Sequence, residues 1–98
     1  MEMDFRELKT SLEEVFQAIL DTIQDGRLPD EAVVVQFARL ATQLHIQADE
    51  DWAGEAEDFA HLANQLLLVV KKGKREDAIR LVNSLQDAQD YCHKTYKS

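Results

Sequence analysis

Residues 5–23 read FRELKTSLEEVFQAILDTI, and the apolar side chains of this stretch recur every three or four residues. The apolar positions are Phe5, Leu8, Leu12, Val15, Phe16, Ile19, Leu20 and Ile23. Because an α-helix has about 3.6 residues per turn, this spacing places all of them on one side of a helix. The stretch therefore predicts an amphipathic helix that must bury one face against other parts of the chain.

The rest of the chain predicts three further helices. Asp25-Gly26 ends the first helix, and a second is expected from about Asp30 to Gln47, with Pro29 in its first turn. A third is expected from Trp52 or Glu55 to Lys72, and a fourth from Arg75 to Tyr96. Their inward positions are Val33, Val34, Phe37, Leu40, Ala41, Leu44 and Ala48; Ala56, Phe59, Ala63, Leu66, Leu67 and Val70; and Ala78, Val82, Leu85, Ala88 or Gln89, Cys92 and Tyr96.

Four helices joined by short turns bury their apolar stripes most simply by packing antiparallel to their chain neighbours. We therefore expect residues 1–98 to form a single all-α domain, an antiparallel up-down-up-down four-helix bundle. The stretches 26–33 and 73–79 resemble one another at the two places where glycine separates two helices. This similarity has two possible explanations: duplication of a helical hairpin, or turn chemistry common to both places.

Composition and charge exclude several classes of partner. Nineteen acidic against eleven basic residues give a net charge of −8, which opposes binding to nucleic acid or to an anionic membrane. The longest unbroken apolar run, residues 66–70, is too short to span a bilayer. The opening MEMDFRELK lacks the pattern of an export signal, so we expect a cytoplasmic protein. The single cysteine, Cys92, excludes an internal disulfide.

No glycine-rich phosphate loop or nucleophile elbow is present, and a packed bundle of this size leaves little room for a substrate. We therefore expect a protein that binds a partner and is not an enzyme. Its scattered acidic side chains favour a basic protein partner. Leu68, on the outer side of the third predicted helix, suggests a second copy of the chain as the other possibility.

His61 is a candidate of a different kind, because it faces away from the apolar stripe of the third predicted helix. An exposed histidine on a helical bundle is the acceptor in histidine phosphotransfer domains, where it belongs to an H-x-x-K-G motif. In this chain Asn64 and Gln65 occupy the lysine and glycine positions. Phosphotransfer through His61 is therefore an alternative function, beside an ordinary surface role.

Residues 85–97 read LQDAQDYCHKTYK and contain an H-x-x-Y-K motif, with His93 as its histidine. Upstream, residues 58–61 read DFAH, and residues 72–78 form the glycine-containing turn KGKREDA. Together these motifs resemble the last two helices of the cytochrome b562 and cytochrome c′ family. The resemblance covers about the last 45 residues. It implies a four-helix bundle and an axial haem ligand at His93, in the open end of that bundle.

The same resemblance limits what the haem site can contain. The methionine ligand of the family corresponds to Phe5 and Leu8 here, so Met1, His45 or water would stand opposite His93. Gln89 removes the C-x-x-C-H motif, so the cofactor would be haem b held without covalent bonds. We expect a haem-free interaction module, with a haem-binding electron-transfer protein as the alternative. No site for a separate metal ion is expected, because the D-x-x-H sequences at His61 and His93 lack the glutamate of bundle iron sites.

Overall fold

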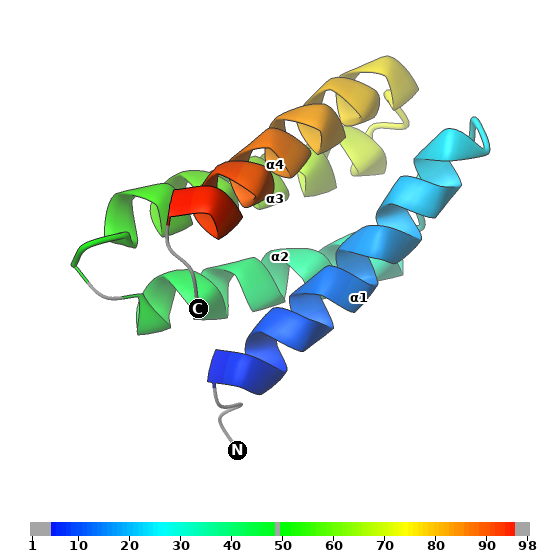
Figure 1. The fold of residues 1–98 in the computed structure, drawn as a ribbon. Helices are drawn as coiled ribbons and strands as arrows, with labels where there is room; N and C mark the ends of the chain where they lie inside the picture. Colours follow the sequence, from blue (N-terminus) through cyan, green and yellow to red (C-terminus); the bar gives the residue numbers. More distant parts are fainter. Residues whose placement is uncertain (1–4, 49, 96–98) are drawn as a thin grey trace.

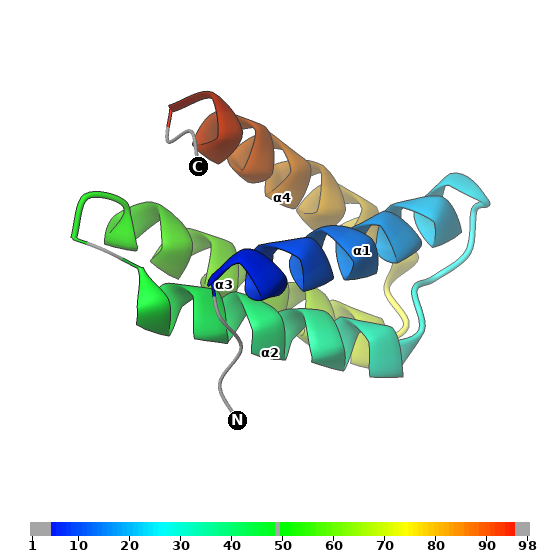
Figure 2. The same cartoon turned by 60° about the horizontal axis from the view of Figure 1, so that its bottom comes forward.

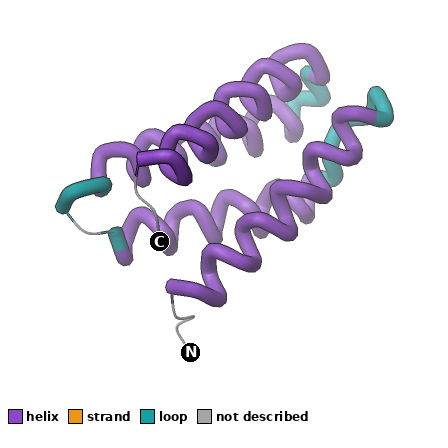
Figure 3. Tube along the Cα trace, viewed as in Figure 1, coloured by secondary structure: helices purple, strands orange, loops and turns teal. Residues whose placement is uncertain are grey.

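The computed structural model describes residues 5–48 and 50–95. These residues form four helices and no strand, as Figures 1 and 3 show. The helices are α1 (Phe5–Gln24), α2 (Glu31–Gln47), α3 (Ala53–Lys71) and α4 (Arg75–Thr95). The all-α prediction is confirmed, and the helix ends lie within about two residues of those expected from the apolar stripes.

The two turns that contain glycine share one hydrogen-bond pattern. After α1, Gly26 adopts a positive φ of 78°, and its N–H donates to the carbonyl of Ile23 at 2.9 Å. The N–H of Arg27 donates to the carbonyl of Thr22 at 3.1 Å, which completes a Schellman motif. The same pair of bonds ends α3 at Gly73, whose φ is 72°. This common turn chemistry accounts for the glycine that the two stretches share.

The start of α2 corrects the position predicted for Pro29. Asp30 is the N-cap: its backbone is extended, with φ −64° and ψ 131°, and its carboxylate accepts a 3.1 Å hydrogen bond from the N–H of Ala32. Since the residue after the cap is the first helical one, α2 begins at Glu31. Pro29 therefore precedes the helix and does not occupy its first turn, and its side chain is buried.

Neighbouring helices pack in chain order: α1 against α2, α2 against α3, and α3 against α4. This order is compatible with the predicted up-down-up-down arrangement. Within the described residues α1 and α4 form no contact of comparable extent. Figures 1 and 2 show these two helices near each other at the glycine turns and diverging toward the end where α4 terminates. At the converging end, the Arg75 guanidinium donates a hydrogen bond to the carbonyl of Gly26.

The core runs through all four helices and consists of apolar side chains. Its centre holds three rings: Phe37 stacks on Phe16 with centroids 5.4 Å apart, and meets Phe59 edge to face at 5.6 Å. Helix α4 adds Ala78 and other small or branched side chains. Every buried side chain among the described residues is hydrophobic. Within the described side chains, the stripes that the spacing predicts are therefore the faces that meet, although Ala48 lies just beyond the end of α2 as its C-cap. The predicted inward positions Phe5, Cys92 and Tyr96 lie outside the side chains that the structure describes.

Candidate functional site

Two of the positions proposed from the family resemblance, 45 and 93, fall at one end of the molecule. His45 lies in the last turn of α2 and is half-buried. Position 93 lies in the last turn of α4, and Figure 1 shows that α2 and α4 end on the same side of the fold. Met1 and the side chain of His93 lie outside the part of the chain that the structure describes. The backbone therefore brings positions 45 and 93 to the same end, which is also the end where α1 and α4 diverge.

His61 lies on the outer face of α3, exposed as predicted. Its Nε2 atom is 3.2 Å from the side-chain amide nitrogen of Gln65, one turn along the same helix. The amide of Asn64 donates to the carbonyl of Ala60 at 2.9 Å. The two positions that hold lysine and glycine in a phosphotransfer motif are thus occupied by amides that interact with their own helix. The exposure of His61 is therefore the one feature that supports a role in phosphotransfer.

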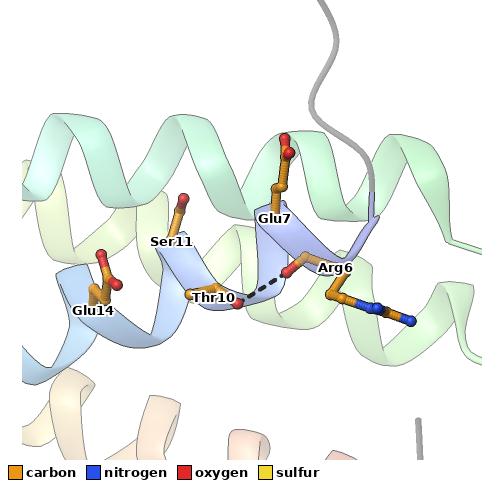
Figure 4. A pocket seen from close by; sticks show the side chains of 5 residues that line it. All are labelled: Arg6, Glu7, Thr10, Ser11 and Glu14. Carbon is orange, nitrogen blue, oxygen red and sulfur yellow. Dashed lines mark hydrogen bonds between the residues drawn. The ribbon is translucent and has the colours of Figure 1, made fainter.

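A shallow hollow, which no sequence motif predicted, lies on the outer side of α1. The described residues that line it all come from that helix: Arg6, Glu7, Thr10, Ser11 and Glu14 (Figure 4). The Thr10 hydroxyl donates a hydrogen bond to the carbonyl of Arg6 at 3.1 Å, so its hydrogen bond is made within the helix. A hollow whose described lining comes from a single helix provides no enclosed binding volume in that part of the structure.

The outer face of α2 carries the arrangement that the predictions overlooked. Five of its residues are spaced by three, four, three and four positions: Ala32, Val35, Arg39, Thr42 and Ile46. We call them the α2 outer strip. Val35 is half-buried and the other four are exposed; the Ile46 side chain keeps 76% of its surface accessible. Figure 2 shows α1 above α2, with none of the described helices covering the lower side of α2 in that view.

Two signals in the sequence could have revealed this strip. Its spacing is that of a second helical seam, opposite the core stripe of the same helix. In addition, Glu31 and Arg39 are the only Asp, Glu, Lys or Arg residues of α2, although such residues make up 31% of the whole chain. Depletion of Lys, Asp and Glu with retention of Arg is the composition typical of protein interfaces.

Leu68 is the other large exposed apolar side chain, with 56% of its surface accessible. It lies on the outer side of α3, as predicted. Its neighbours on that face are His61, Gln65 and Lys72, all exposed and polar. Leu68 is therefore an isolated apolar residue and not part of an apolar patch.

The described residues contain no group of three or more His, Cys, Asp or Glu side chains placed to hold a metal ion. Among those residues, no helix is long and apolar enough to cross a membrane. No protein-family model, curated protein or solved structure matches this chain. The resemblance to the cytochrome family is therefore supported only by the quoted motifs and by the four-helix all-α architecture.

Proposed function

We propose that this chain is a non-enzymatic, antiparallel four-helix bundle of the cytoplasm that acts by binding a protein partner, without haem. The observation that carries the proposal is the α2 outer strip. Hydrophobic side chains fill the described core, so the groups that remain available for recognition lie on the surface. Of the outer helix faces, that of α2 has the composition of an interface, while the others carry the acidic side chains that keep the protein soluble.

A photo-crosslinking amino acid placed at Gln43 tests this function. Gln43 is exposed beside the strip, and Gln65 is another exposed glutamine, on the outer face of α3. In cells, we expect covalent protein adducts from position 43 and none above background from position 65. Adducts in equal yield from both positions, or from neither, would contradict the proposal. The comparison separates a specific surface from general stickiness, because both variants have the same composition and net charge.

Haem binding at the diverging end is the second candidate function. It is favoured by the placement of positions 45 and 93 at the end where α1 and α4 separate. Imidazole is a common axial ligand of haem iron, and the half-buried His45 could offer one opposite His93. When bound, haem would supply one-electron chemistry. Helices α2 and α4 would hold its ligands in place.

Titration of the purified protein with haemin tests this second function. If this second function holds, haemin gives a Soret shift that His93→Ala removes and His45→Ala weakens. His61→Ala is the matched control, since His61 lies on the outer face of α3. No Soret shift, or a shift that survives His93→Ala, would exclude an axial ligand at position 93.

A further inference from the structure

The outer face of α2 differs from the other outer helix faces in its charge. Exposed carboxylates occupy α1 at Glu7, Glu13, Glu14 and Asp21, α3 at Glu57 and Asp58, and α4 at Glu76, Asp87 and Asp90. On α2 the single carboxylate is Glu31, at the first helical position. The α2 outer strip therefore runs along a face about 20 Å long whose one carboxylate, Glu31, lies at its N-terminal end.

The strip has two polar members, Thr42 and Arg39. The Thr42 hydroxyl donates to the carbonyl of Ala38 at 2.9 Å, so its hydrogen bond is made within the helix. The one charge, Arg39, is at the centre, seven residues from Ala32 and seven from Ile46. Its guanidinium is a cation that interfaces accept more readily than lysine, because it is less strongly hydrated.

We propose that the α2 outer strip is the contact between two copies of this chain, which pair antiparallel about a two-fold axis at Arg39. This inference rests on the proposed interaction function and names its partner. The strip of each copy lies along that of the other, so the contact is isologous.

The positions of small and large side chains favour this register. Because Ala32 and Ile46 are equally far from Arg39, an antiparallel pair sets Ile46 of one copy against Ala32 of the other. A large side chain then packs against a small one at both ends of the contact, as interdigitated helices require. Near the centre, Gln36 and Gln43 provide amide oxygens that can accept hydrogen bonds from the guanidinium of the second copy.

The charge of the chain favours a second copy in this place. Each copy carries a net charge of −8, so two copies repel each other in most orientations. Contact through the outer faces of α1, α3 or α4 would set carboxylates against carboxylates, whereas the α2 outer strip brings together neutral groups and two arginines. A contact one helix wide is small, so we expect a reversible dimer with a micromolar dissociation constant.

Sedimentation equilibrium of the full chain over a range of concentrations tests the inference. The variants are Ile46→Glu, the control Leu68→Glu, and the double variant Ala32→Lys with Ile46→Glu. Positions 32, 46 and 68 are all exposed, so each variant should fold, which circular dichroism verifies. We expect Ile46→Glu to raise the dimer dissociation constant by at least about tenfold and Leu68→Glu to leave it within about threefold.

The double variant tests the register. In the antiparallel pairing, each introduced lysine faces an introduced glutamate of the other copy, so dimerisation should return. A parallel pairing would set lysine against lysine, and the double variant would stay monomeric. That result would overturn the antiparallel register.

Three other results would overturn the inference itself: a wild-type protein that stays monomeric at every concentration, a dimer unaffected by Ile46→Glu, or one that Leu68→Glu dissociates. If the wild type is monomeric but position 43 still forms adducts in cells, the second copy is excluded while the proposed function stands. If neither is observed, both fail.

Discussion

Phe37 lies at the centre of the fold, fully buried between the rings of Phe16 and Phe59. Its side chain links α2 to both α1 and α3. Truncation would remove both ring contacts and leave a cavity in a close-packed interior.

We predict that Phe37→Ala lowers the free energy of unfolding by about 3–5 kcal/mol, the range for large-to-small changes in a core. Urea unfolding followed by circular dichroism measures it. Phe37→Leu, which keeps much of the volume, should cost less than about 1.5 kcal/mol. A loss below about 1 kcal/mol for the alanine variant would mean that position 37 is not packed as described.

Residue-by-residue prediction succeeded for the core, and on the surface it placed His61 and Leu68 correctly but missed the α2 outer strip. The spacing of residues such as Leu8, Phe37 and Val82 predicted burial correctly, because each repeats with the helical period. The same spacing recurs on the opposite side of α2, where periodicity alone does not distinguish a contact surface from a solvated one. The charge depletion there was visible in the sequence, but only a folded helix shows that Ile46 keeps 76% of its surface exposed.

At the scale of the elements, two of the three glycines end helices and the third lies inside one. Gly26 and Gly73 have positive φ and end α1 and α3, whereas Gly54 is in the first turn of α3. An ideal Cβ at any of the three would meet no atom within 4 Å. Space is therefore equal at all three positions, and backbone conformation alone decides the effect of a side chain.

We predict that Gly26→Ala and Gly73→Ala each destabilise the protein by about 1–2 kcal/mol, because alanine is strained in the left-handed region. Gly54→Ala is the matched control and should stabilise it, by up to about 1 kcal/mol, because alanine is the better helix former. Thermal unfolding of the three variants provides the comparison. The same sign of change at positions 26 and 54 would contradict this explanation of the turns.

Sequence reasoning located these elements well because glycine and the capping aspartate act locally. It misplaced Pro29 because a proline just before an N-cap and one in the first turn have nearly the same local sequence. It did not predict the divergence of α1 and α4, which depends on contacts between segments far apart in the chain. The bond from Arg75 to the carbonyl of Gly26 joins residues 49 positions apart and has no local signature.

At the scale of the whole molecule, the net charge of −8 opposes self-association at long range, while the α2 outer strip favours it at short range. We therefore predict that added salt strengthens the dimer. Between about 0.05 M and 0.5 M sodium chloride, the dissociation constant should fall, because screening shortens the reach of the repulsion. Sedimentation at the two salt concentrations measures the change. A dimer weakened by salt would indicate a contact held by opposite charges, which the α2 outer strip does not contain.

The most direct measurement of the central claim, that the outer face of α2 is the contact surface, is methyl relaxation by a soluble paramagnetic agent. As protein concentration rises, the relaxation enhancement should fall at the methyl groups of Val35 and Ile46, while that of the exposed Leu68 stays constant. An enhancement that stays constant at Val35 and Ile46, or one that falls at Leu68 instead, would contradict the claim.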